Sequence, residues 1–118
     1  MYSLVGGHVE PGESFRDCCI REIMEELELT PDADFRVAES PIVPTCEYTA
    51  VSGSAGVPTL YSADIYAVHI LNIEASMKID ANQVNRWLNA GEIAKLSTSD
   101  GRLISDQVRT LFTMCGVM

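Results

Sequence analysis

The stretch GHVEPGESFRDCCIREIMEELEL, residues 7 to 29, decides the fold of this chain. It begins as a glycine-containing loop, in which Pro11-Gly12 predicts a turn. Ser14 is a typical helix N-cap, and apolar side chains then recur at helical spacing. This apolar stripe consists of Phe15, Cys19, Ile23 and Leu27, flanked by Cys18, Ile20 and Met24. We therefore predict a loop followed by an amphipathic helix whose apolar face lies in the core.

The other face of this predicted helix is unusually acidic. Glu22 and Glu26 are four residues apart, so their carboxylates lie on nearly the same face. Like charges at this spacing destabilise a helix by roughly 0.2 to 0.5 kcal/mol. A divalent cation would reverse that effect, because Mg²⁺ and Mn²⁺ prefer carboxylate oxygens as ligands. A solvated surface with an ordinary ion pair between Arg21 and Glu25 is the simpler explanation of the acidic cluster taken alone, so the metal interpretation depends on the residues around the cluster.

The order of residues along this stretch resembles the signature of the Nudix hydrolase family. That signature has Gly, five residues, Glu, seven residues, Arg-Glu, an apolar residue, any residue, Glu-Glu, any residue, Gly and an apolar residue. The matching residues are Gly7, Glu13, Arg21, Glu22, Ile23, Glu25, Glu26 and Leu29. Glu28 stands in place of the last glycine. The segments 84–88 and 92–93 are similar to a later stretch of the family, so the resemblance covers nearly the whole chain.

The resemblance implies a metal site on the helix. Glu22 and Glu26, with Glu25 beside them, would hold one or more Mg²⁺ or Mn²⁺ ions that bridge to a diphosphate. The backbone carbonyl of Gly6 would join these ligands. The substrate would be a nucleoside diphosphate linked to another moiety, and water would attack a phosphorus atom. Neither the identity of that moiety nor the bond that is cleaved follows from the motif.

The resemblance also implies supporting residues. Arg21 would orient the carboxylates through a salt bridge to Glu13, as residues behind metal ligands commonly do. Many family members use a further glutamate, from a later loop, as general base or extra ligand. Asp80 is the substitute that this chain offers. If Asp80 does not reach the metal, Glu22 or Glu25 would act as the base.

The fold implied by the resemblance is an α/β/α sandwich of helices around a mixed sheet. Residues 2–7 are similar to the segment that directly precedes the family's motif, so we expect the usual first strands to be missing. A wrongly assigned start, a true loss, or strands supplied by a second chain would each explain this. Because unpaired strand edges invite pairing with another chain, we expect a homodimer.

The rest of the chain predicts strands and then helices. Extended segments are expected at 35–38, 42–52 and 59–73, with a flexible connection at 53–56 and a hairpin between the two longer segments. A short helix is expected at 90–95 and a final helix at 99–114. The apolar stripe of that final helix would be Leu103, Ile104, Val108, Leu111 and Phe112. Trp87, the lone tryptophan, is expected to pack in the core at the sheet edge.

Composition and charge limit the class of protein. With 118 residues, of which 47% are hydrophobic, the chain predicts one domain spanning residues 1–118. It has no apolar run of membrane-spanning length and no recognisable signal segment, so we expect a cytoplasmic protein without a membrane partner. The formal net charge of -9 argues against nucleic-acid polymers as partners, and implies that a polyphosphate needs a metal to bind. The four cysteines lack zinc-site spacing and are expected to be buried thiols.

Two alternatives to a hydrolase stay open. The first is a Nudix-fold domain that binds a nucleotide or a protein partner without catalysis, which the missing first strands favour. The intact carboxylates favour the enzyme. The second is an acidic interaction domain in which the motif occurs by chance, and such a domain would have no affinity for metal.

Overall fold

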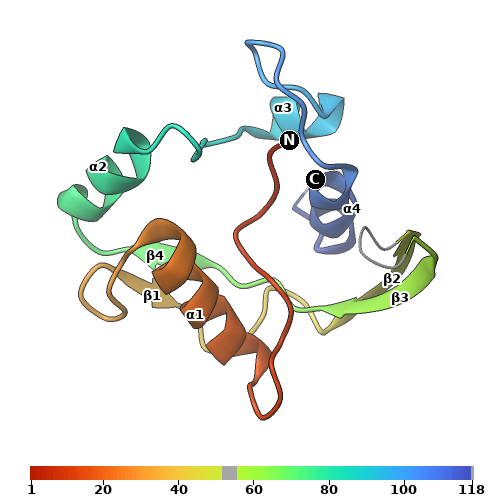
Figure 1. Ribbon diagram of the computed structural model, residues 1–118, viewed down its shortest axis with the longest axis horizontal. Helices are drawn as coiled ribbons and strands as arrows, with labels where there is room; N and C mark the ends of the chain where they lie inside the picture. Colours follow the sequence, from red (N-terminus) through yellow and green to blue (C-terminus); the bar gives the residue numbers. More distant parts are fainter. Residues whose placement is uncertain (52–55, 118) are drawn as a thin grey trace.

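The chain folds into short helices and strands arranged around an open centre. The computed structural model describes residues 1–51 and 56–117. Their elements are α1 (Phe15–Leu27), β1 (Phe35–Val37), β2 (Cys46–Val51), β3 (Pro58–Ala63), β4 (Val68–Ile70), α2 (Ile73–Ala81), α3 (Ala90–Lys95) and α4 (Asp106–Met114). Figure 1 shows α1, α2, β1 and β4 on one side and α3, α4, β2 and β3 on the other, with the N-terminal segment running between them.

The strands form two separate sheets. β1 pairs with β4 and β2 pairs with β3, both in antiparallel register. In the second pair Tyr48 lies opposite Tyr61, which confirms the predicted hairpin. The mixed α/β content is therefore as expected. The mixed sheet of the sandwich is not confirmed, because every strand pairing among the described residues is antiparallel and each sheet has only two strands.

Helix α1 forms as its sequence predicts. The Ser14 hydroxyl accepts a hydrogen bond from the backbone N–H of Asp17 at 3.0 Å, which caps the first turn. The helix ends at Glu28, whose φ of 56° and ψ of 40° are left-handed. A side chain in this region costs roughly 1 kcal/mol relative to glycine. The Lys78 ammonium donates to the Glu28 carbonyl at 2.7 Å, and this bond from α2 secures the helix end.

Two apolar clusters stabilise the two sides of the molecule. The first consists of Ile23, Leu29, Phe35, Val37, Ala75 and Ile79, and joins α1 and α2 to the β1–β4 sheet. The second consists of Ile93, Ile104 and Val108, with Tyr2 and Phe112 packed against it. All four cysteines are free thiols, as predicted, and three of them are buried, whereas Cys19 is only half-buried. Each cluster is small, so each side of the molecule depends on few residues.

The region between 42 and 81 differs from the sequence prediction. The strand expected at 42–52 begins only at Cys46, and Ser52 together with most of the expected 53–56 connection lies outside the described residues. The prediction of one long strand at 59–73 is wrong. This segment contains two short strands, β3 and β4, which pair with different partners. Helix α2 was not predicted. Asn72 caps it by accepting from the Ala75 N–H at 2.7 Å, and Ala75 and Ile79, one turn apart, are buried.

The region after α2 also differs from the sequence prediction in two places. Helix α3 has the predicted bounds, but α4 begins at Asp106 rather than at residue 99. Residues 97–104 form a turn with Gly101 at a φ of 83°, and Ile104 bridges to Tyr2 instead of joining the helix. Trp87 is not in the core, since 60% of it is exposed. It lies between α2 and α3, where its indole N–H donates to Asp80 at 2.6 Å.

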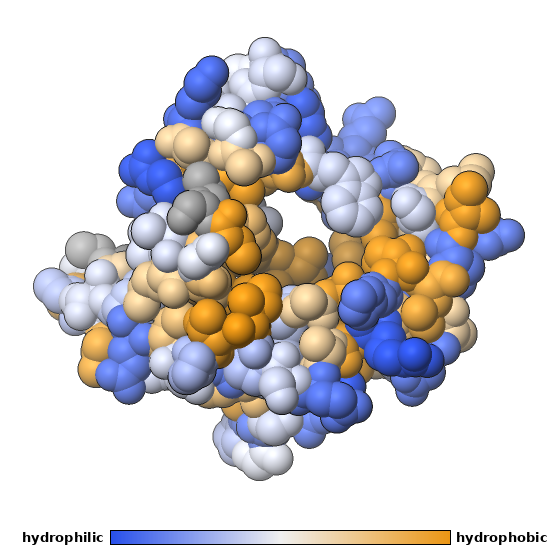
Figure 2. Space-filling model, turned by 180° about the vertical axis from the view of Figure 1, so that it is seen from behind, coloured by the Kyte–Doolittle hydropathy of each residue, from blue (hydrophilic) through white to orange (hydrophobic). Residues whose placement is uncertain are grey.

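The surface carries many apolar side chains. The large hydrophobic residues that are more than half exposed include Leu60, Ile73, Met77, Val84 and Leu103. Figure 2 shows an opening through the molecule with hydrophobic residues at its edge. Among the described residues, no helix is both long enough and apolar enough to cross a membrane.

Candidate metal and diphosphate site

A tight turn places the first acidic residue of the site. The backbone N–H of Glu13 donates to the carbonyl of Glu10 at 3.0 Å, and Gly12 has a φ of 79°. Proline followed by a left-handed glycine is the sequence that a type II turn requires, and Pro11-Gly12 supplies it. The turn closes further because the Glu10 N–H donates to Glu13 Oε1 at 3.1 Å. Glu13 is thereby held next to the first turns of α1.

Arg21 binds Glu13 through two parallel hydrogen bonds. Its Nε donates to Glu13 Oε2 at 2.8 Å and its Nη2 donates to Oε1 at 3.0 Å. This fork geometry is the strongest form of an arginine–carboxylate pair. The Arg21 hydrogen bond lowers the pKa of Glu13 to about 2, and the same bond raises the pKa of Arg21. Both groups are therefore charged at neutral pH.

The remaining donors of Arg21 reach the other carboxylates of α1. Nη1 donates to Glu22 Oε1 at 2.9 Å and, less closely, to Glu25 Oε2 at 3.4 Å. Nη2 also donates to the His8 carbonyl at 3.2 Å, which ties the glycine loop to the helix. One guanidinium thus fixes the loop and orients two glutamates.

The loop passes close to the Glu22 carboxylate. A Cβ atom added at Gly7 would lie 2.8 Å from Glu22 Cδ and still closer to Oε1, so a side chain there would displace the Glu22 carboxylate. The Gly7 carbonyl accepts from the buried Cys18 thiol at 3.6 Å. Glycine at this position therefore leaves the Glu22 carboxylate in the place where Arg21 holds it. Sequence reasoning did not identify Cys18 as part of this arrangement, although it lies one turn before Arg21.

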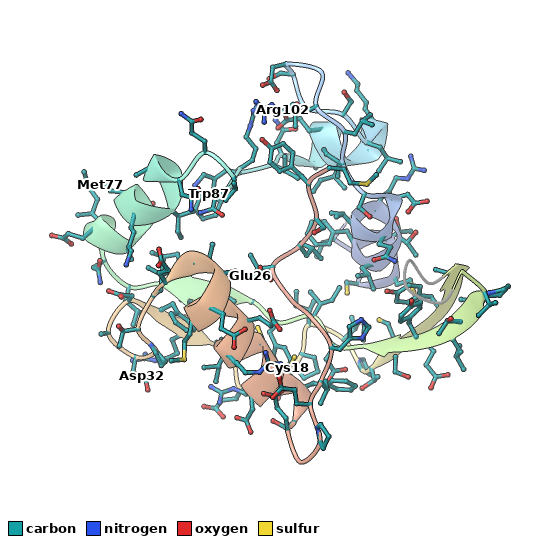
Figure 3. The ribbon with its side chains drawn as sticks, in the orientation of Figure 1. Cys18, Glu26, Asp32, Met77, Trp87 and Arg102 are labelled. Atoms are coloured by element: carbon teal, nitrogen blue, oxygen red, sulfur yellow. The ribbon has the colours of Figure 1, made fainter. Side chains whose placement is uncertain are left out.

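Glu22 and Glu26 lie together on the face of α1 that meets the N-terminal segment. Figure 3 shows Glu26 on this side of the helix. Burial raises the pKa of Glu26, and the neighbouring Glu22 carboxylate raises it further, whereas the backbone of Gly6 lowers it. A carboxylate that is partly buried beside a second carboxylate forms an environment that a cation would stabilise.

The donor set suits a hard divalent cation. Mg²⁺ keeps several waters and is commonly held by one or two carboxylates together with substrate phosphates. Glu22 and Glu26 supply such a pair. Within residues 1–51 and 56–117, no group of three or more His, Cys, Asp or Glu side chains is arranged to hold a metal ion. Glu25 is turned toward Arg21, and Asp80 accepts a hydrogen bond from Trp87 at the end of α2.

Comparison with known proteins identifies the family. The model of the NUDIX domain matches residues 1–106, so the chain belongs to the Nudix family. Two NAD-capped RNA hydrolases named NudC, from Pseudomonas syringae pv. syringae and Pseudomonas syringae pv. tomato, are each 59% identical to it over 29 residues. That match covers 25% of this chain and 10% of each relative. No solved structure matches the chain significantly.

Proposed function

We propose that this protein is a metal-dependent pyrophosphohydrolase that cleaves a nucleoside diphosphate linked to another moiety. Family membership supports hydrolysis of nucleoside diphosphate derivatives. The observation that carries the proposal is the arrangement around Arg21, which binds Glu13 through two bonds and Glu22 through a third. Such an arrangement orients carboxylates at a fixed place beside a glycine loop.

The proposed metal ligands are Glu22 and Glu26, with Glu25 and the Gly6 backbone completing the set. A bound Mg²⁺ or Mn²⁺ ion would neutralise the phosphates and lower the pKa of a water molecule. The water oxygen forms a bond to phosphorus as a P–O bond of the diphosphate breaks. Glu25 is the proposed acceptor of the water proton, because its carboxylate is more exposed than that of Glu22.

Arg21 and Glu13 are proposed as positioning residues. The guanidinium holds Glu22 at 2.9 Å, and Glu13 in turn holds the guanidinium. Their contribution is to keep a ligand carboxylate oriented before the substrate arrives. Partners of metal ligands in this role typically change affinity or activity by about 10- to 100-fold when they are mutated.

The test is release of phosphate or nucleotide from a panel of compounds in the presence of Mg²⁺ or Mn²⁺. The panel contains nucleoside triphosphates, dinucleoside polyphosphates, nucleotide sugars, ADP-ribose, NAD and, because of the named relatives, an NAD-capped RNA. The variant is Glu26→Gln. The matched control is Glu74→Gln, which makes the same change on an exposed residue of α2.

Release that needs metal, disappears in Glu26→Gln and persists in Glu74→Gln is the expected result. With a net charge of -9, we expect a small molecule rather than a nucleic-acid polymer to be the substrate. Silence across the whole panel, from protein shown to be folded, would favour the alternative of a Nudix-fold domain that binds a nucleotide or protein partner without catalysis.

We also propose that residues 1–118 act as one domain and that two copies associate. Sheets of two strands have unpaired edges on both sides, and isolated two-stranded hairpins are marginally stable. Exposed apolar side chains supply additional surface for such a contact. Sedimentation equilibrium tests the homodimer, since a monomer at all concentrations contradicts it. Cytoplasmic localisation stays a prediction that cell fractionation tests.

A further inference from the structure

A cavity outside the acidic site lies between the β2–β3 hairpin and α4. Figure 1 shows these elements next to each other. The cavity has a volume of about 380 Å³ and is lined by Tyr48, Thr49, Ala50, Asp106, Gln107 and Thr110. This volume is within the range of small-molecule sites, which is about 300–1,000 Å³. None of these residues belongs to the proposed hydrolytic machinery.

Buried residues hold both walls of the cavity in place. Cys46 at the start of β2 and Cys115 at the end of α4 are both buried. Burial raises the pKa of Cys115, and the neighbouring Cys46 thiol raises it further. Val108, seven residues before Cys115 and on nearly the same face of α4, is buried in the second apolar cluster. Asp106 and Thr110, each two residues from Val108, lie on the other side of the helix, where they line the cavity.

One wall is a fixed aromatic ring. Tyr48 stacks on Tyr61, directly across the hairpin, with ring centroids 5.4 Å apart and an interplanar angle of 22°. This cross-strand stack restricts the orientation of the Tyr48 ring before any ligand arrives. A flat ring at the edge of a cavity is the surface on which nucleobases stack.

The other wall is polar and has no basic group. Asp106 only accepts hydrogen bonds when ionised, Gln107 both donates and accepts, and Thr110 does the same through its hydroxyl. None of these three side chains hydrogen-bonds another described residue. None of the described residues that line the cavity is Lys or Arg, which disfavours phosphate here, whereas a carboxylate favours a ligand that carries N–H donors.

We propose that this cavity binds the base of a nucleoside with an exocyclic amino group, such as adenosine or cytidine. The base stacks on Tyr48, the amino group donates to Asp106, and the Gln107 amide pairs with the ring edge. A glutamine side chain can make two such bonds to adenine, and a carboxylate accepts from the cytosine amino group. The choice of a nucleoside as ligand rests on the proposed function, which acts on nucleoside diphosphate derivatives.

The test is equilibrium binding of nucleosides without metal, measured by chemical-shift changes in the folded protein. Adenosine and cytidine are compared with uridine and with ribose 5-phosphate, which has no base. We expect Tyr48→Ala to weaken adenosine binding by about tenfold or more, and Tyr48→Phe to retain it. Gln107→Ala, at an exposed helical position, is expected to weaken binding severalfold without disturbing the hairpin.

Three results would overturn the proposal. The first is no adenosine binding by the unaltered protein. The second is binding that survives both Tyr48→Ala and Gln107→Ala, and the third is uridine or ribose 5-phosphate binding as tightly as adenosine. Glu26→Gln should bind adenosine normally, because it alters only the acidic site. If no substrate is hydrolysed but adenosine still binds, the proposed hydrolysis is wrong and the proposed nucleoside site stands. If substrate is hydrolysed but adenosine does not bind at the cavity, only the proposed nucleoside site is wrong.

Discussion

Arg21 and Glu13 are joined by two hydrogen bonds, of 2.8 Å from Nε and 3.0 Å from Nη2, across eight residues of sequence. The pair connects the turn before α1 to the middle of that helix. Because the same guanidinium also holds Glu22 at 2.9 Å, the position of one proposed metal ligand depends on this pair.

Arg21→Lys is expected to lower metal-dependent hydrolysis by about 10- to 100-fold, because lysine cannot make the two parallel bonds or reach Glu22 at the same time. Steady-state rates at saturating metal are the measurement. Arg36→Lys is the control, since Arg36 lies on β1 with only a 4.0 Å contact to Asp32. Equal rates for both variants would show that Arg21 does not position the site.

The Glu13 pair also predicts a pH dependence of stability. Its folded pKa is about 2, below the ordinary value of 4.5, so folding favours the ionised carboxylate. The stabilisation is fully present above about pH 4.5 and is lost as the pH falls toward 2. Urea midpoints of the unaltered protein and Glu13→Gln should therefore converge through this range. Arg21 stays charged throughout, so a difference that does not change with pH would contradict the pairing.

Ile23→Ala is expected to destabilise the protein by about 2–5 kcal/mol, because Ile23 is 3% exposed in the first apolar cluster. Met24, the next residue, is 45% exposed, so Met24→Ala should cost much less. Free energies of unfolding from urea titrations measure both. Similar costs for the two would mean that the helix faces are assigned wrongly.

Glu28→Gly is expected to stabilise the protein by about 1 kcal/mol, because the left-handed φ of 56° strains a residue with a Cβ. The bond from Lys78 is to the backbone carbonyl and survives the change. Leu27→Gly, one residue earlier inside the helix, should instead destabilise. Thermal melts compare the two, and destabilisation by Glu28→Gly would contradict the left-handed helix end.

The parts that were predictable from sequence are those determined by local interactions. The Ser14 cap, the turn at Pro11-Gly12 and the helix that carries Glu22 and Glu26 depend on neighbours within a few residues. The spaced motif also identified the family correctly. The approach of Gly7 to Glu22 depends on how a loop folds back onto a helix, and the sequence did not predict it.

The predictions that are wrong concern segments whose structure depends on tertiary contacts. Residues 59–73 look like one apolar strand, but pairing with two different partners divides them into β3 and β4. Helix α2 does have a local signal, since Asn72 is a good cap and Ala75 and Ile79 are four residues apart. Trp87 was expected in the core because of its size, yet it is 60% exposed with its N–H bound to Asp80.

Binding of Mn²⁺ by the apo protein tests the central claim most directly. Titration calorimetry would compare the unaltered protein with Glu26→Gln and with the exposed control Glu74→Gln. We predict that the unaltered protein and Glu74→Gln bind the ion, and that Glu26→Gln binds it at least about tenfold more weakly, since it removes one of two adjacent carboxylates. Equal Mn²⁺ affinity in all three proteins would contradict the assignment of Glu22 and Glu26 as the metal site.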